Sequence, residues 1–277
     1  MLKIAIISNA TKDIEMKTAM SVAEFLNGKA QVFMCEENRL PSDFGVTYVS
    51  YEDLWARVEL AIVIGGDGTL LRVASTCAKC SIPALGINLG TVGFLTEVEV
   101  SDIENALNAV LNGNYIKEKR MLLKVSINDE YISYHALNDT VIAKHDGVKI
   151  IDLDLYTGDE LVYHYRADGL IIATPTGSTG YSISAGGPVV DPIMDLYIAT
   201  PVCAHMLLAR SAILPAQREI IIRITNEKAS AVVTTDGERQ RIITAEDELH
   251  ISKSDYEFEL IKIGKNSFYN TLKSKLS

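Results

Sequence analysis

A strand, a glycine-rich loop and a helix follow one another without a break near residue 65. Residues 60–64 (LAIVI) form a short continuous apolar run, which predicts a strand buried on both faces. The run ends at GGDGT (residues 65–69), and apolar residues at helical spacing follow up to residue 78. A helix that begins directly at the carboxyl end of a buried strand is the repeating step of a parallel α/β sheet. The first part of the chain is therefore expected to be α/β.

The GGDGT loop also has the composition of an anion site. Ligands of open α/β sheets bind at the carboxyl ends of the strands, where this loop is expected to lie. Its three glycines let a backbone approach phosphate closely, and the N-terminus of the following helix favours anions. The loop matches neither GxxxxGK[ST] nor GxGxxG. The plainer alternative is that Asp67 only caps the helix, but three glycines around one carboxylate exceed what a cap needs.

Strand and helix patterns alternate over roughly the first 115 residues, which predicts a doubly wound parallel sheet. Ser101 and Glu104 have the spacing of a capping box at the start of the last of these helices. The expected strands are residues 3–7, 31–34, 60–64 and 83–87, and the expected helices are residues 14–26, 69–78 and 101–111.

The pattern changes to short strands and turns after about residue 120. Apolar and acidic residues alternate over 149–156, and TGDE (157–160) predicts a hairpin turn. Further turns are expected at residues 128–129 and 236–237. This part is expected to be an all-β sandwich. We expect an α/β domain over residues 1–118, joined by a returning helical tail at 265–277, and a sandwich domain over 119–264.

Composition limits the classes of function. Among the 277 residues, 48% are hydrophobic and 22% are charged, so the chain is not expected to be disordered. The net charge of −10 and a longest basic cluster of KEKR (117–120) argue against nucleic acid as a partner. No apolar stretch approaches 18 residues, no signal-peptide layout is present, and only four cysteines occur, so we expect a cytoplasmic protein without a membrane span.

Two further polar segments follow expected strands. Arg166 and Asp168 precede a strand at 170–173, which runs into a loop rich in glycine and hydroxyl groups at 174–188. Such a loop suits a ligand with sugar hydroxyls and flat rings, although an ordinary surface loop is the alternative. Asn138 and Asp139 follow a strand at 132–137, and an adjacent amide and carboxylate can bind vicinal ribose hydroxyls. Most Asn-Asp pairs, however, are turns.

Together these segments resemble one family, the NAD kinases, over almost the whole chain. GGDGT alone is also similar to lipid kinases of the diacylglycerol and sphingosine type and has a counterpart in phosphofructokinases. The combination is specific. It consists of GGDGT (65–69), GINLGTVGFLT (86–96), ND (138–139), the block from Asp168 to Pro188, and TDGE (235–238), in that order.

The resemblance implies an N-terminal α/β domain, a C-terminal β-sandwich that binds NAD, and an active site between them. It implies transfer of the γ-phosphoryl group of ATP to the 2′-hydroxyl of the adenosine ribose of NAD, which gives NADP. It also implies a homodimer or homotetramer with NAD near a subunit interface. Because the histidines show no metal-ligand spacing, we expect no protein-held metal and a Mg²⁺ or Mn²⁺ ion that arrives with the nucleotide.

The resemblance also assigns roles to residues. Asp67 corresponds to the catalytic carboxylate, Gly68 to a position where the backbone approaches the nucleotide, and Arg72 to a cation that could meet phosphate. Asn138 and Asp139 match the pair that holds the adenosine moiety, and Asp168 could accept from the nicotinamide carboxamide. The remaining expected binding residues are Phe94, Lys149, Arg166, Thr179, Gly180, Tyr181, Ser182, Ile183, Ser184 and Glu238.

Some positions depart from the family or carry a plainer interpretation. Gly180 stands where Ala is common, and Glu238 where Gln is common, so its carboxylate is less suited to phosphate. Lys149 is equally well a solvated lysine, and His205 is expected to be a packed structural histidine rather than a ligand contact. Cys77 and Cys80 are expected to be ordinary helix thiols rather than a redox pair.

Two other classes of function stay open from the sequence. A lipid kinase would share GGDGT, but residues 86–95 do not resemble the corresponding lipid-kinase loop, and the acidic chain offers no basic patch for a membrane. A non-catalytic sensor of NAD(H) or NADP(H) on the same fold would have no need of the Asp67 carboxylate.

Overall fold

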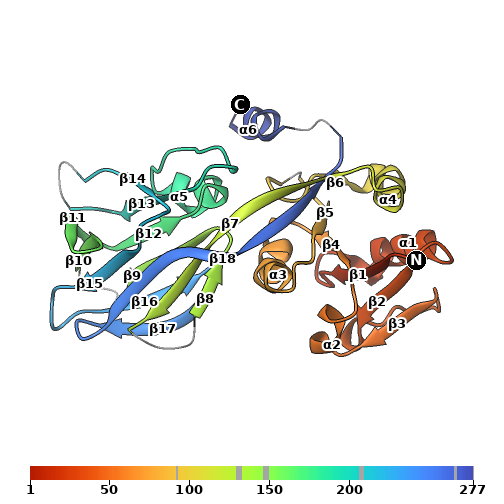
Figure 1. Cartoon of the computed structure of the whole chain (residues 1–277), viewed down its shortest axis with the longest axis horizontal. Helices are drawn as coiled ribbons and strands as arrows, with labels where there is room; N and C mark the ends of the chain where they lie inside the picture. The colour runs from red at the N-terminus through yellow and green to blue at the C-terminus, as the bar shows by residue number, and fades with distance from the viewer. Residues whose placement is uncertain (92, 129–132, 146–149, 206–208, 265–266, 277) are drawn as a thin grey trace. The chain divides into compact units, whose positions relative to one another are not determined.

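The structure is a computed structural model, and it describes the chain except residues 92, 129–132, 146–149, 206–208, 265–266 and 277 (Figure 1). The chain forms two compact units. Unit 1 comprises Met1–Lys119 and Glu257–Ser277, and unit 2 comprises Arg120–Tyr256. No helix in the described part of the chain is long and apolar enough to cross a membrane.

Unit 1 is a parallel α/β sheet, as expected. The strands follow the order β5-β4-β1-β2-β3, and β6 pairs with β5. The strands are β1 (Lys3–Ser8), β2 (Gln31–Cys35), β3 (Val46–Val49), β4 (Leu60–Gly65), β5 (Ala84–Asn88) and β6 (Val98–Glu99). The helices are α1 (Lys17–Leu26), α2 (Tyr51–Trp55), α3 (Asp67–Lys79), α4 (Ile103–Leu111) and α6 (Phe268–Leu276).

Helices cover this sheet because its strands are apolar on both faces. Ile4, Ile6, Ile62 and Ile64 lie in one buried cluster with the apolar residues of α1 and α4. The alternate residues of β4, such as Val63, are also fully buried, and α3 contacts β4 and β5. Figure 1 shows α3 on the other side of β4 and β5 from α4. Two buried faces explain the continuous apolar runs of the sequence.

One local prediction is wrong. Helix α4 begins at Ile103 with Asp102 at its N-cap and no side-chain cap hydrogen bond, so the capping box of Ser101 and Glu104 does not form. Ser101 instead lies in a short 3₁₀ turn, Val100–Asp102. Strand β3 and helix α2 were not predicted, and together they span only nine residues.

Unit 2 consists of two mostly antiparallel sheets, which confirms the expected sandwich. One sheet has the order β14-β13-β12-β9-β16-β17, and the other contains β11-β10-β15-β18 with β7 and β8. The strands are β7 (Ile116–Ile127), β8 (Ser133–Ala136), β9 (Asp139–Lys144), β10 (Ile151–Thr157), β11 (Glu160–Ala167), β12 (Gly169–Ala173), β13 (Leu196–Val202), β14 (Ala212–Pro215), β15 (Ile220–Ile224), β16 (Ser230–Thr235), β17 (Glu238–Thr244) and β18 (Glu248–Lys262), and one short helix, α5 (Tyr181–Ser184), follows β12.

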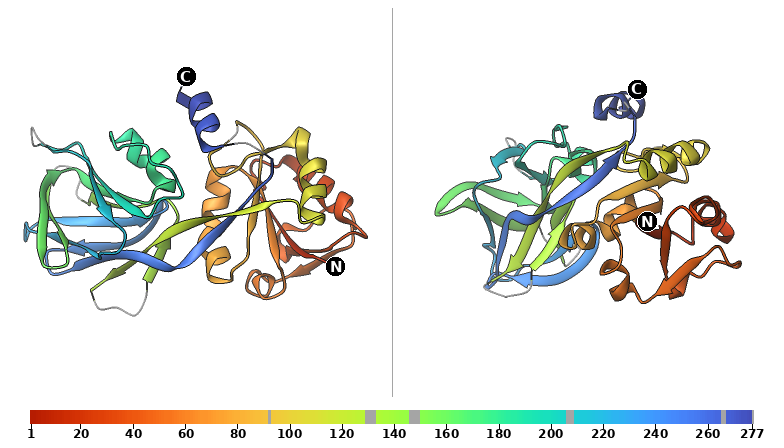
Figure 2. Two further views of the ribbon diagram at one scale, coloured as in Figure 1. Left: turned by 45° about the horizontal axis from the view of Figure 1, so that its top comes forward. Right: turned by 45° about the vertical axis from the view of Figure 1, so that its right-hand side comes forward.

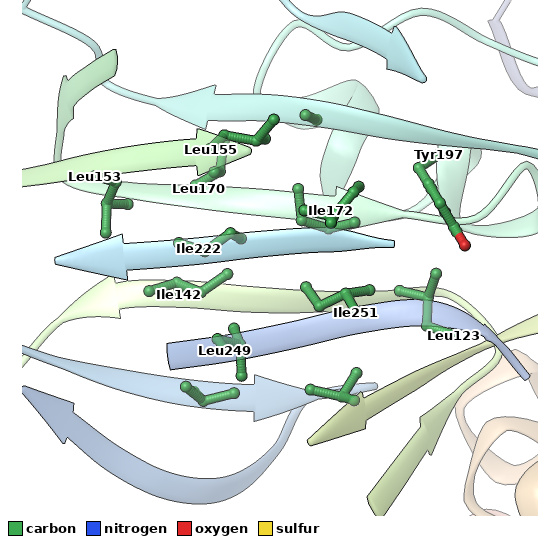
Figure 3. Packing of buried hydrophobic residues seen from close by; sticks show 14 of the residues in the cluster. Leu123, Ile142, Leu153, Leu155, Leu170, Ile172, Tyr197, Ile222, Leu249 and Ile251 are labelled. Atoms are coloured by element: carbon green, nitrogen blue, oxygen red, sulfur yellow. The ribbon is translucent and has the colours of Figure 1, made fainter. Parts of the chain in front are cut away.

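The core of unit 2 lies between the two sheets. Leu153 and Leu155 of β10 share one buried cluster with Ile142 of β9 and Ile172 of β12 (Figure 3). These positions alternate with polar residues along β10, because successive side chains of a strand point to opposite faces. The hairpin turn expected between β10 and β11 is present at residues 158–159.

Two strands continue from one unit into the other. The unit boundaries fall within β7, between Lys119 and Arg120, and within β18, between Tyr256 and Glu257. Both strands can be followed in each view of Figure 2. Within unit 1, Lys119 Nζ lies 2.7 Å from Glu257 Oε2, so an ion pair joins the two strands there.

Candidate functional site

The GGDGT loop lies at the carboxyl end of β4 and opens α3, as expected. Gly66 is the N-cap of α3, and the Asp67 carboxylate points away from its own helix toward the segment after β5. Oδ2 of Asp67 accepts the backbone N–H of Phe94 at 2.8 Å. Oδ1 accepts the N–H groups of Leu95 and Thr96 at 3.1 and 2.9 Å, and the Thr96 hydroxyl at 2.9 Å. Asp67 is therefore not a helix cap, because it holds a loop 27–29 residues away in sequence.

This loop approaches Asp67 so closely that no side chain fits between them. A Cβ at Gly93 would lie 1.8 Å from Oδ1 of Asp67. A Cβ at Gly68, in contrast, would meet no heavy atom within 4 Å. The fold therefore requires a glycine at position 93, whereas the open space at Gly68 is available to a ligand.

A pocket of about 520 Å³ opens beside Asp67 within unit 1. Its lining is mostly glycine backbone and polar side chains, which suits a phosphate group better than an apolar ligand. The residues that line it are Lys12, Gly66, Asp67, Gly68, Asn88, Leu89, Gly90, Thr91, Gly93 and Lys275.

Two expected binding residues of unit 1 have other surroundings. Arg72 is exposed on α3 and does not line the pocket. Phe94 contributes its backbone N–H to Asp67, and its ring contacts the ring of Phe268 with centroids 5.9 Å apart. Phe94 thus joins the loop to the C-terminal helix α6.

In unit 2, Asn138, Asp139 and Gly180 come together. A Cβ at Gly180 would lie 3.4 Å from Asn138 Nδ2 and 3.7 Å from Asp139 Oδ2. Gly177 lies against the same segment, because a Cβ there would be 2.1 Å from the carbonyl oxygen of Asn138. The structure therefore brings the predicted pair onto the predicted loop, although the two are about 40 residues apart in sequence.

Asp236 holds the segment that carries Asn138 and Asp139. Its Oδ2 accepts the N–H of Leu137 at 2.7 Å. Its Oδ1 accepts the N–H groups of Asn138 and Asp139 at 2.8 and 3.1 Å. In the sequence, Asp236 stands out only as part of a predicted turn and of the TDGE motif. The turn is present, with positive φ at Asp236 and Gly237, but nothing in the sequence indicates which backbone the carboxylate binds.

The carboxyl groups of Asp139 and Asp236 both have raised pKa values. Burial and the charge of Asp236 raise the pKa of Asp139 to about 7. Burial also raises the pKa of Asp236 to about 6, although its three backbone hydrogen bonds act in the opposite direction. Perturbed carboxyl groups of this kind cluster at functional sites.

Asp168 lies at the other end of β12. Its carboxylate pairs with Lys144 Nζ at 2.7 Å, beyond the pairing of Gly169 with Ala143. Asp139 pairs with Ala173, at the opposite end of β12. At about 3.3 Å per residue, the backbones of Asp168 and Ala173 are about 15 Å apart along the strand. Asp168 and Asp139 therefore do not share one small pocket in this unit. Lys144 was not predicted, because a basic residue at a strand end carries no specific signal.

Arg166 is also on this side of the unit. It is exposed on β11, and its Nε lies 3.9 Å from Asp152 Oδ1. His205 donates its backbone N–H to the carbonyl of Arg166 at 2.9 Å. The His205 side chain is exposed, so the expected packed structural histidine is wrong.

The residues of the loop after β12 differ in exposure. Tyr181 is 48% exposed and Ser184 is exposed, whereas Thr179, Gly180 and Ile183 are half-buried. Ser182 is fully buried, and its Oγ lies 3.1 Å from Thr200 Oγ1. The Ser182 hydroxyl therefore joins the loop to β13, the strand that carries Thr200.

The remaining candidates are placed as follows. Glu238 is exposed at the start of β17, and Lys149 lies outside the described residues. Cys77 is buried in α3, and burial, followed by the neighbouring Cys80, raises the pKa of its thiol to about 12. A thiol with a raised pKa is a poor nucleophile. This favours the interpretation of Cys77 and Cys80 as ordinary thiols over a redox pair.

No group of three or more His, Cys, Asp or Glu side chains that could hold a metal ion occurs among the described residues. In the pocket of unit 1 the one carboxylate, Asp67, already accepts four hydrogen bonds. This donor set fits a divalent ion held mainly by phosphate oxygens and water.

The α/β unit carries a polar pocket at the GGDGT loop, and the other unit is a β-sandwich, as the motifs predicted. The family model for the ATP-NAD kinase N-terminal domain matches residues 4–115, and that for the ATP-NAD kinase C-terminal domain matches residues 137–263. The chain belongs to the NAD kinase family, which confirms the resemblance seen in its motifs.

Several relatives match this chain over almost its full length. The NAD kinase of Caldanaerobacter subterraneus subsp. tengcongensis is 36% identical, with 100% of this chain and 99% of that protein covered. The NAD kinase of Lachnoclostridium phytofermentans is 37% identical, with 99% of each covered. An NAD kinase from Archaeoglobus fulgidus in complex with ATP has a TM-score of 0.77 and 28% identity, and covers 99% of this chain and 98% of its own. Yeast NADH kinase complexed with NADH shares the fold, with a TM-score of 0.89 at 24% identity, and covers 100% of this chain and 87% of its own.

Proposed function

We propose that this protein transfers the γ-phosphoryl group of ATP to the 2′-hydroxyl of the adenosine ribose of NAD, which yields NADP. The observation that carries the proposal is the GGDGT loop, where a fixed carboxylate borders a glycine-lined pocket in a chain that matches NAD kinases end to end. Neither the lipid kinase nor the non-catalytic sensor is favoured by these relatives.

Asp67 is proposed as the catalytic carboxylate. Its Oδ1 accepts three hydrogen bonds, but its Oδ2 accepts only one, from Phe94. Because a carboxylate oxygen has two lone pairs, Oδ2 can accept one more hydrogen bond, from the attacking hydroxyl. A general base contributes about 10²–10⁴-fold, and alignment of the weakly nucleophilic hydroxyl with the γ-phosphorus contributes at least as much.

The donor is proposed to bind at the pocket of unit 1, where the open space at Gly68 admits phosphate. A Mg²⁺ or Mn²⁺ ion bound to the phosphates would neutralise part of their charge. Arg72 stays a weaker candidate for phosphate, because it is exposed outside the pocket.

The acceptor is proposed to bind to unit 2. Asn138 and Asp139 are the candidates for the adenosine ribose, with Gly180 beside them and Tyr181 exposed for stacking. Asp168 is the candidate for the nicotinamide carboxamide, with Arg166 nearby on β11. The roles of Lys149 and Glu238 remain predictions from the sequence, as do a homodimeric or homotetrameric assembly and a cytoplasmic location.

A coupled assay tests the function. Purified protein is incubated with NAD, ATP and Mg²⁺, and NADP is measured with an NADP-specific dehydrogenase, with EDTA and no-ATP controls. NADP formation that depends on both ATP and the metal ion supports the proposal. If no NADP forms while NAD or NADP still binds by calorimetry, the sensor is favoured. Strong cosedimentation with liposomes would favour a lipid kinase.

The variant Asp67→Asn tests the catalytic carboxylate. We expect it to keep NAD binding, since the NAD candidates lie in unit 2, and to lose most turnover. Circular dichroism checks that the variant is folded. Turnover within a few-fold of the unaltered protein would show that Asp67 has another role.

A further inference from the structure

The pocket beside Asp67 has two cations that no motif singles out. Lys12 and Lys275 both line it, and they come from opposite ends of the chain. Lys12 is in the loop after β1, and Lys275 is in the last turn of the C-terminal helix α6. Among the described residues that line the pocket, these lysines and Asp67 are the only charged groups. The lining therefore carries two ammonium groups against one carboxylate, a net positive charge in an otherwise acidic protein.

Lys12 is held over the GGDGT loop by the loop that carries it. A Cβ at Gly66 would lie 3.2 Å from Lys12 Nζ, so the ammonium group lies directly against the glycine backbone. The buried Asp13 fixes the Lys12 loop, because its carboxylate accepts the Ser8 hydroxyl at 2.8 Å and the Thr18 N–H at 2.9 Å. Asn9 Nδ2 also donates to Thr69 Oγ1 at 3.2 Å, which joins this loop to the GGDGT segment.

Lys275 reaches the pocket from a helix that packs on the loop held by Asp67. Its Nζ lies 5.4 Å from the centroid of the Phe94 ring. The same ring contacts Phe268 at the start of α6. Residues from the first and last turns of α6 therefore lie against the Phe94 ring. Phe94 is also the residue whose backbone N–H donates to Oδ2 of Asp67.

The ion pairs of the described residues leave both ammonium groups of this pocket out. No carboxylate among the described residues forms an ion pair with Lys12 or Lys275, whereas Lys17, Lys117, Lys119 and Lys262 of the same unit each have one. Two lysines that line one glycine-rich pocket and have no ion pair with a described carboxylate match an anion with several charges.

We propose that Lys12 and Lys275 bind the phosphate chain of the phosphoryl donor, so that the C-terminal helix α6 is part of the donor site. This inference rests on the proposed function and adds the residues that recognise the donor. Lys12 supplies charge from the loop after β1, and Lys275 supplies it from α6, where Phe268 acts as a positioning residue through its contact with Phe94.

The test compares Lys12→Gln and Lys275→Gln with two matched controls. Lys17→Gln changes a nearby lysine that is paired with Glu15, and Lys273→Gln changes a lysine of α6 that does not line the pocket. We expect each pocket variant to lower kcat/KM for ATP roughly 10-fold, the size of one charged contact, and to leave the KM for NAD within about twofold. Lys275→Arg is expected to keep most of the activity, and Phe268→Ala to reproduce the loss seen with Lys275→Gln.

A binding measurement separates the lysines from catalysis. Inorganic tripolyphosphate is titrated into each protein by calorimetry, and we expect weaker binding only in the pocket variants. ATP kinetics and tripolyphosphate binding that match the control variants would overturn the inference, as would an equal rise in the KM for NAD. If the unaltered protein forms no NADP, the proposed function fails, and tripolyphosphate binding still decides whether the lysines hold a phosphate chain.

Discussion

Two aspartates of this protein hold backbone segments that are far away in sequence. Asp67 binds the N–H groups of residues 94–96, and Asp236 binds those of residues 137–139. Hydrogen bonds to a charged acceptor are stronger than those between neutral groups, so each aspartate fixes its segment firmly. In both cases the segment carries or adjoins residues of the candidate site.

Asp236→Asn tests the positioning role in unit 2. The amide keeps one accepting oxygen and turns an NH₂ group toward a backbone N–H, so at least one hydrogen bond is lost. We expect a loss of about 1–3 kcal/mol in the free energy of unfolding. We also expect a several-fold rise in the KM for NAD, with the KM for ATP unchanged. Urea unfolding and steady-state kinetics measure both, with the exposed Glu227→Gln as control. An unchanged KM for NAD would show that Asp236 supports the fold only.

The raised pKa values of Asp139 and Asp236 predict how stability changes with pH. Both values, about 7 and about 6, lie above the ordinary 3.8, so the folded state binds more protons than the unfolded state between these limits. This contribution to stability is complete below about pH 4 and is lost as the pH rises through about 7.

Asp139→Asn removes one of these titrations. From pH 5 to pH 8 the unaltered protein is expected to lose about 1–3 kcal/mol more unfolding free energy than the variant. Urea unfolding followed by circular dichroism at both pH values measures the difference. Asp159→Asn, in the exposed turn before β11, is the control and should behave like the unaltered protein. The same pH dependence in the Asp139 variant would contradict the assignment.

The motifs predicted Asp67, Asn138 and Asp139 as site residues, because a motif specifies a residue type at a fixed position. It could not show their partners, because these are mainly backbone N–H groups, which every residue except proline has. It missed Asp236 for the same reason, and Lys144 because a pairing with Asp168 depends on the register of β9 and β12.

At the scale of elements, the segment between β5 and β6 is held at two points. Asp67 holds its residues 94–96, and Glu97 forms a buried ion pair with Lys262 and accepts the N–H of Ile263 at 2.9 Å. Glu97, Lys262 and Ile263 all belong to unit 1. The geometry of the pocket therefore depends on a loop that is fastened both to α3 and to β18.

Gly93→Ala tests this loop. The new Cβ would overlap Oδ1 of Asp67 at 1.8 Å, so the carboxylate or the loop must move. Forcing extra atoms into such a contact costs about 1–3 kcal/mol, and we expect a lower thermal midpoint together with loss of most NADP formation. Gly90→Ala is the matched control for stability, because a Cβ there meets no heavy atom within 4 Å. Equal thermal midpoints for the two variants would contradict this account of the loop.

Element prediction succeeded where the apolar pattern is strong. The buried strands β1, β4 and β5 and the hairpin of β10 and β11 are present, because burial on one or both faces leaves a periodic signal. The capping box failed because Ser101 entered a 3₁₀ turn instead. Strand β3 lies at the edge of its sheet, and its half-buried residues leave no clear pattern.

At the scale of the whole molecule, the α/β and sandwich classes followed from the change of pattern near residue 120. The sequence did not show that β7 and β18 each continue from one unit into the other. These two strands pair with each other, and pairing between segments so far apart in sequence leaves no local signal. Nor did it show that the C-terminal helix places a lysine at the pocket of the GGDGT loop.

The most direct test of the central claim is to identify the reaction product. NAD, ATP and Mg²⁺ are incubated with the protein, and the product is analysed by ³¹P NMR and mass spectrometry. We expect one new phosphomonoester at the 2′ position of the adenosine ribose, formed in equal amount to the ADP released. A phosphate at any other position, or release of ADP with no phosphorylated dinucleotide, would contradict it.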